Sequence, residues 1–201
     1  MLPDSIRKEI NLLSHAVDVG MALWGMQLPA NPVTVARNIL KVTQTLGAGN
    51  RRDRRPSDEE LKTLYASHIG AVVEFAVETA MRRGEILSMK PEHKTRNELL
   101  IPLTKTDEPR TIPLSKRACE LFETVVNWNT NGHTLSQAFR RICDDKNIVD
   151  LRFHDLRHEA ASRFFEKGLD IAEVAKITGQ TFATLQTYTH LKASAIARKL
   201  G

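Results

Sequence analysis

A ten-residue run in the first third of the chain sets the main limit on how the sequence can fold. Residues 47–56 read Gly-Ala-Gly-Asn-Arg-Arg-Asp-Arg-Arg-Pro, and so combine glycines, four arginines and a closing proline. Glycine and proline interrupt helices and strands, and clustered like charges stay in solvent, so this run predicts an exposed basic linker. We therefore expect residues 1–46 to fold separately from residues 57–201.

The segments before the run are helical in pattern but too few to make a full domain. Residues 4–24 carry Ile10, Leu13 and Val17 near the spacing of one helix face, and residues 33–46 form a shorter second segment. A helix or two with an apolar face needs further elements to cover that face. Residues 1–46 are therefore not expected to form a complete domain.

The longer part of the chain mixes helical segments with one hairpin. Ser57 and Glu60 form a capping box that starts a helix. Two short apolar segments, 99–103 and 110–114, flank a polar loop, which predicts a β-hairpin. The predicted helices cover residues 58–68, 70–81, 115–128, 135–146, 154–168, 170–178 and 191–199. The predicted fold class is therefore α+β, mainly helical, with a small antiparallel β-sheet.

Composition narrows the class of protein. The chain is 41% hydrophobic and 26% charged, and it holds no apolar run of the ~20 residues that span a bilayer. Its first residues lack the pattern of a secretory signal, so we expect a cytoplasmic protein. The two cysteines, Cys119 and Cys143, lack metal-ligand spacing. A net charge of +5 and a pI near 9.4 are compatible with a nucleic-acid partner.

The segment His154-Asp155-Leu156-Arg157-His158 carries the strongest chemical signal. His154 and Arg157 lie three residues apart on one predicted helix, so both can face one phosphate group. The same letters also read as a variant of the zinc-protease helix. That alternative requires a third metal ligand, for which the chain offers His190 at best, and we predict no metal site. His158 is then expected to be a helix-face residue near the site.

Three more segments supply matching chemistry. Arg82 begins the turn Arg-Arg-Gly-Glu, Lys105 lies in the polar loop of the hairpin, and Tyr188 precedes Thr-His-Leu. A guanidinium can bind two phosphate oxygens at once. A phenol with a pKa of ~10 can attack phosphorus when cations and a base assist it. The other tyrosine, Tyr65, has the spacing of a core residue.

Taken in chain order, these four segments resemble those of the tyrosine recombinase, or phage integrase, family. The resemblance implies site-specific cutting and rejoining of double-stranded DNA through a 3′-phosphotyrosyl intermediate, with no cofactor and as a homotetramer on DNA. It also implies that residues 1–46 are the end of a helical core-binding domain. The catalytic residues that it implies are Tyr188, Arg82, Lys105, His154 and Arg157.

Each of these residues takes a role from the resemblance. Tyr188 would be the nucleophile, and the two arginines would hold the phosphate. Lys105 would protonate the leaving 5′ oxygen, and His154 would accept or position a proton at the nucleophile. Glu85, three residues after Arg82, would orient an arginine from the same turn.

One segment departs from the family pattern. The family usually has Leu-Gly-His nine residues before the tyrosine, whereas this chain has Thr178-Gly179-Gln180, with Gln180 eight residues before Tyr188. A glutamine can donate a neutral hydrogen bond to a phosphate oxygen but adds no charge, so slower catalysis is expected. The alternatives are a catalytically impaired DNA-binding remnant of a mobile-element integrase and, less favoured, a topoisomerase-like enzyme.

Further arginines are candidates for contact with the DNA backbone. Those in the linker fit this role, although a solvated linker explains them equally well. The candidate DNA-binding residues are Arg51, Arg52, Arg54, Arg55 and Arg83.

Overall fold

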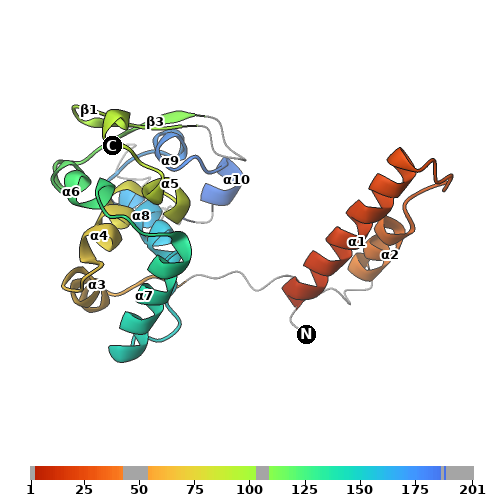
Figure 1. Cartoon of the computed structure of the whole chain (residues 1–201), viewed down its shortest axis with the longest axis horizontal. Coiled ribbons are helices and arrows are strands. Elements are labelled where there is room, and N and C mark those ends of the chain that lie inside the picture. The colour runs from red at the N-terminus through yellow and green to blue at the C-terminus, as the bar shows by residue number, and fades with distance from the viewer. Residues whose placement is uncertain (1–2, 43–53, 103–108, 187, 189–201) are drawn as a thin grey trace, which may run out of the picture. The chain divides into compact units, whose positions relative to one another are not determined.

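The computed structural model describes residues 3–42, 54–102, 109–186 and 188 (Figure 1). The chain divides into two compact units, Met1–Arg52 and Asp53–Gly201, and each is described by itself. The division falls inside the run 47–56. Two predicted features, the loop that carries Lys105 and the helix at 191–199, lie outside the described residues.

The first unit is a pair of helices, α1 (Pro3–Leu23) and α2 (Pro32–Val42), that pack against each other. Asn31 joins them: its Oδ1 accepts hydrogen bonds from the amides of Val33 and Thr34, and its Nδ2 donates to the Ser14 carbonyl. Many large apolar side chains of this unit stay exposed among the described residues. They are Leu12, Leu13, Leu23, Trp24, Met26, Leu28, Val35 and Ile39.

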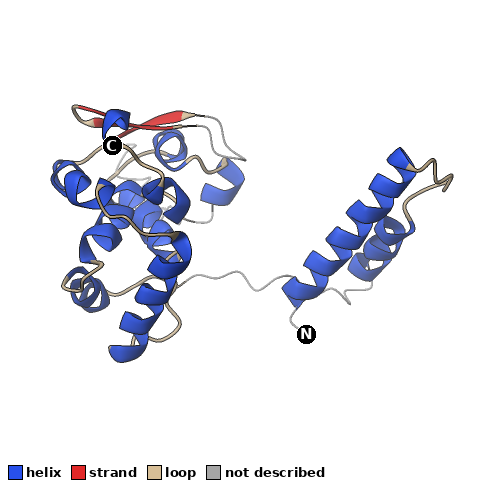
Figure 2. Ribbon diagram, viewed as in Figure 1, coloured by secondary structure: helices blue, strands red, loops and turns tan. Residues whose placement is uncertain are grey.

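The second unit is mainly helical, with one small sheet (Figure 2). Its α-helices are α3 (Asp58–Tyr65), α4 (Gly70–Thr79), α5 (Arg83–Leu87), α6 (Lys116–Val126), α7 (Gly132–Asp145), α8 (Asp155–Glu166), α9 (Ile171–Thr178) and α10 (Phe182–Leu185). A short 3₁₀ helix, η1 (Pro91–His93), precedes the sheet. The predicted fold class, a mainly helical α+β domain, is confirmed.

Helix α4 lies at the centre of this unit because most of its surface is apolar. Val72, Val73, Phe75 and Val77 are all buried, and the helix packs against α3, α6 and α8. The helix ends at Thr79, earlier than predicted, because Ala80 takes a left-handed conformation with φ 52°. The chain then turns and starts α5, which is too short to leave a periodic signal in the sequence.

The sheet has three antiparallel strands in the order β1-β2-β3: Lys94–Thr95, Glu98–Ile101 and Arg110–Pro113. Leu99 pairs with Ile112, and both are buried, as the alternating pattern requires. The two-residue strand β1 has no apolar alternation, which explains why only the hairpin was predicted. Ile101 pairs with Arg110, so Arg110 begins the last strand.

Two apolar clusters hold the second unit together. The larger one includes Phe75, Phe122 and Phe139. The smaller one joins α8, α9 and α10 through Phe164, Val174, Ile177 and Leu185, and Tyr188 packs against it. Among the described ranges, no helix combines the length and apolar character needed to span a membrane.

Candidate active site

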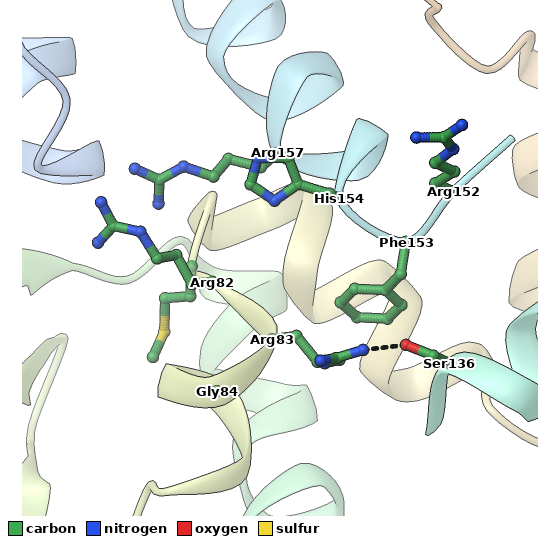
Figure 3. A pocket seen from close by; sticks show the side chains of 9 residues that line it. Arg82, Arg83, Gly84, Ser136, Arg152, Phe153, His154 and Arg157 are labelled. Atoms are coloured by element: carbon green, nitrogen blue, oxygen red, sulfur yellow. Dashed lines mark hydrogen bonds between the residues drawn. The ribbon is translucent and has the colours of Figure 1, made fainter. Parts of the chain in front are cut away.

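A cavity of about 390 Å³ lies between the start of α5, helix α7 and the start of α8 (Figure 3). Its lining is cationic and contains no acidic side chain. The lining residues are Met81, Arg82, Arg83, Gly84, Ser136, Arg152, Phe153, His154 and Arg157. Four guanidiniums around a hollow of this size make a site for an anion such as a phosphate group.

Arg82 is held by the turn that follows α4. Its extended backbone (φ −69°, ψ 148°) places it at the N-cap of α5. Its amide donates to Glu85 Oε2 at 2.8 Å, and its guanidinium Nη1 donates to Glu85 Oε1 at 2.9 Å. Two hydrogen bonds to Glu85 therefore hold Arg82 in this turn.

Glu85 is nearly fully buried, with 3% of its surface exposed. Burial alone would raise the pKa of its carboxyl, but hydrogen bonds from Arg110, from the Arg82 amide and from the Arg82 guanidinium outweigh it. The pKa of Glu85 is lowered as a result, so the carboxylate stays charged at neutral pH.

Arg110 also binds Glu85, and sequence reasoning did not identify it as a candidate site residue. Its Nη2 donates to Glu85 Oε2 at 2.8 Å, and its Nε reaches the Ile177 carbonyl at 3.4 Å. Its Nη1 is buried with no partner among the described residues. A side chain on Gly179, which has φ +67°, would come within 3.2 Å of this guanidinium. The only sequence signal was a charged residue at the first position of an apolar strand.

Arg157 comes from the first turn of α8 and is 4% exposed. Its Nη1 donates to the Ala80 carbonyl at 2.7 Å and its Nη2 to the Thr178 carbonyl at 2.5 Å. Burial, and then the nearby charge of Arg82, lower the pKa of Arg157 to about 10, so it remains a cation at neutral pH. In Figure 3 the side chains of Arg82 and Arg157 extend toward the same side of the cavity.

His154 stands at the N-cap of α8, just before the helix rather than within it. The residue is exposed at the mouth of the cavity, and its ring lies beside Arg157 (Figure 3). Although the residue as a whole is exposed, partial burial of its ring, followed by the effects of His158 and Arg157, lowers the pKa of His154. The imidazole is therefore neutral at neutral pH, in a form that can accept a proton.

Tyr188 approaches the site from the end of α10. Its amide donates to the Leu185 carbonyl at 2.9 Å, and its ring stacks on Phe165 with centroids 6.5 Å apart. Its hydroxyl is hydrogen-bonded to Nδ1 of His158. His158 in turn meets the His154 ring edge-on at 5.7 Å. The sequence placed His158 near the site but did not pair it with the tyrosine.

Gln180 follows the left-handed Gly179 at the end of α9. Its amide donates to Thr178 Oγ1 at 3.2 Å, and its side-chain Oε1 is buried without a partner among the described residues. Because Arg157 donates to the carbonyl of Thr178, Gln180 lies two residues from that contact. Lys105, Arg51 and Arg52 lie outside the described residues.

The remaining candidate arginines have partners within the chain. Arg54 pairs with Glu60, and Arg55 donates to Glu159 and Glu166, both at 2.8 Å. Arg83 lines the cavity and is hydrogen-bonded to Ser136 (Figure 3). Contact of these arginines with DNA stays a prediction.

Comparison with known proteins finds relatives that are named as DNA recombinases and integrases. A shufflon-specific DNA recombinase of Escherichia coli is 35% identical over 98% of this chain and 53% of its own length. A putative integrase/recombinase of Haemophilus influenzae is 26% identical over 88% of this chain and 62% of its own length. The chain thus spans between half and two thirds of the length of these relatives.

The fold is similar to that of the Tn1549 transposon integrase solved in complex with circular intermediate DNA. The TM-score is 0.74 at 11% identity, over 100% of this chain and 80% of the other. Residues 57–195 match the family model of the phage integrase family. This match covers more than half of the chain, and the chain belongs to the phage integrase family of tyrosine recombinases.

Proposed function

We propose that this chain is a site-specific DNA recombinase that cuts and rejoins strands through a 3′-phosphotyrosyl intermediate. The observation that carries the proposal is the cationic cavity lined by Arg82, Arg157 and His154, together with the position of Tyr188. The Tyr188 hydroxyl is hydrogen-bonded to His158 of α8, the helix that also carries Arg157. The recombinases and integrases among the similar proteins support it. Its substrate is double-stranded DNA in the cytoplasm of a bacterial cell.

In the proposed reaction, Oη of Tyr188 attacks the phosphorus of a phosphodiester. The bond from phosphorus to the 5′ oxygen breaks as the bond to Oη forms, and the 5′ oxygen takes a proton from Lys105. The extra negative charge of the transition state lies between the guanidiniums of Arg82 and Arg157. Rejoining reverses these steps and needs no nucleotide, because the phosphotyrosyl bond retains the ester energy.

Glu85, Gln180 and His154 take supporting parts in this proposal. Glu85 fixes the direction of Arg82 through two hydrogen bonds, so the cation is in place before the substrate arrives. Gln180 contributes a neutral hydrogen bond to the phosphate. His154, neutral at the cavity mouth, handles protons during the two steps. Strand exchange between two duplexes implies a tetramer on DNA.

The test is a search for the covalent intermediate. The protein is incubated with a pool of duplexes that carry nicks at varied positions, and adducts are separated by denaturing electrophoresis. A nick close to the cut lets the short leaving strand diffuse away, which traps the intermediate. We expect an adduct with the wild-type chain and none with Tyr188→Phe.

Tyr65→Phe is the matched control. Burial raises the pKa of Tyr65 to about 12, so this phenol is a still poorer nucleophile, and its loss should leave the adduct in place. An adduct that persists in Tyr188→Phe would contradict the assignment of the nucleophile. Salt-sensitive DNA binding without any adduct would instead identify a DNA-binding remnant.

A further inference from the structure

The phenol of Tyr188 and the imidazole of His158 form a contact that the proposed mechanism leaves unused. Tyr188 Oη is hydrogen-bonded to Nδ1 of His158, and the two rings lie 5.6 Å apart with their planes 35° from parallel. His154 lies four residues earlier on the chain, beside the arginines of the cavity. The nucleophile therefore meets the second histidine of the segment.

We infer that His158 is the catalytic base that takes the proton from Tyr188. This inference rests on the proposed function, since it assigns a step of the same reaction. A phenol with an ordinary pKa of ~10 is almost wholly protonated at neutral pH, so a base in contact with its hydroxyl is needed for attack. Nδ1 of His158 is in hydrogen-bond contact with that oxygen.

With His158 as the base, His158 and Lys105 carry the protons of both steps, and the role left to His154 is to position the reacting groups. As Oη bonds to phosphorus, its proton moves to Nδ1 of His158, while the 5′ oxygen leaves with the proton of Lys105. In rejoining, the 5′ hydroxyl gives its proton back to Lys105 as it attacks phosphorus, the bond from phosphorus to Oη breaks, and Nδ1 returns its proton to the phenol. His158 must therefore enter the reaction neutral, with its proton on Nε2.

The groups around the Tyr188–His158 pair indicate different roles for His154 and His158. Among the described residues, the groups around it include the His154 ring, 5.7 Å from that of His158, the buried cation Arg157 on the same helix, and Phe165, which stacks on Tyr188. His154 stands at the cavity where a phosphate would bind. Gln180, one position from where the family usually has the histidine of Leu-Gly-His, cannot accept a proton at neutral pH. His158 is thus the imidazole placed at the nucleophile.

Two substitutions separate proton transfer from positioning. In His158→Asn, the side-chain Oδ1 takes the place of Nδ1 and can still accept the hydrogen bond, but it cannot take the proton. His158→Phe removes both abilities. His68→Asn, in the exposed turn between α3 and α4, is the matched control. The measurement is the single-turnover rate of adduct formation on a nicked duplex, between about pH 5 and pH 8.5.

We expect the wild-type rate to rise with pH and to level off once imidazole is neutral. His158→Asn should lower the rate on the order of 100-fold or more and remove this rise, while DNA binding is unchanged. His68→Asn should match the wild type. The inference is overturned if His158→Asn keeps both the rate and its pH dependence, because the hydrogen bond alone would then be sufficient.

A second readout needs no catalysis. The ¹⁵N shifts of the imidazoles report the tautomer, and the His158 signal is identified by its absence in His158→Asn. We expect His158 to be neutral with Nδ1 unprotonated, and its Nδ1 signal to move in Tyr188→Phe. A proton on Nδ1 would sink the inference. If even the wild type forms no adduct, the proposed function fails, and the tautomer still decides whether Nδ1 can accept the proton.

Discussion

At the scale of single residues, the site depends on one buried carboxylate. The two oxygens of Glu85 bind the guanidinium of Arg82, which faces the cavity, and the guanidinium of Arg110, which begins β3. The carboxylate of Glu85 thereby links α5 to strand β3 of the sheet. A buried charge that loses its partners is costly, so this carboxylate should matter to stability as well as to the reaction.

Glu85→Gln should lower the free energy of unfolding of the second unit by about 3 kcal/mol at pH 7, since two guanidiniums lose their charged acceptor. The folded-state pKa of Glu85 is lowered, so its stabilisation is present above the unfolded pKa and disappears as pH falls through the folded one. The difference in the free energy of unfolding between wild type and Glu85→Gln should therefore become smaller in acid.

Urea unfolding followed by the fluorescence of Trp128, in a Trp24→Phe background, measures this difference. Glu123→Gln, an exposed position on α6, is the control and should show little change at either pH. A constant difference between pH 7 and acid would show that the charge of Glu85 is not the stabilising factor.

Sequence reasoning named the residues that local motifs mark, and it missed those that only the tertiary structure brings in. Arg82, His154 and Arg157 stand in recognisable segments, and the structure places all three around one cavity. Arg110 lies 25 residues from Glu85 in the chain, so no local pattern could pair them. The partner of His158 depends on how α10 returns to α8, which periodicity does not determine.

At the scale of elements, long helices were predictable and short elements were not. Sequence analysis predicted α3, from its capping box, and also α8 and α9, whereas α5, α10 and β1 are five residues or shorter. These short elements carry or adjoin the site: α5 begins after Arg82, and α10 ends before Tyr188. Part of the site geometry was therefore beyond the reach of periodicity.

The segment before α3 offers a test at this scale. Arg55 connects it to α8 through Glu159, which is 3% exposed, and through Glu166. Burial opposes ionisation of Glu159, but hydrogen bonds from Arg55 and Arg163 lower its pKa overall. Arg55 thus holds a buried charge within the protein, in addition to any role at DNA.

Arg55→Met should lower the free energy of unfolding by about 1–2 kcal/mol, a value reduced by the partial exposure of Arg55. Arg141→Met, on the exposed surface of α7, should leave stability unchanged. Chemical unfolding and DNA titration are run on both variants. Weaker DNA binding by Arg55→Met at unchanged stability would show that this arginine serves DNA contact rather than attachment of the segment.

At the scale of the whole molecule, the net positive charge would drive the proposed binding of DNA. The chain carries a net charge of +5, and four of its arginines line the cavity. Arg152 lines this hollow, and the residue is exposed to solvent. Such an arginine can neutralise one phosphate and release the counterion that the phosphate held.

Binding should therefore weaken steeply as salt rises, and Arg152→Met should reduce the slope of log K against log salt by about one unit. The loss should be similar for unrelated DNA sequences, because a backbone contact reads no bases. Fluorescence anisotropy with two unrelated duplexes over a range of salt measures both effects, with Arg141→Met as control. Equal slopes for Arg152→Met and wild type would place this arginine away from the DNA backbone. A loss confined to one duplex would instead make it a base-reading residue, so the two duplexes separate a general electrostatic grip from sequence recognition.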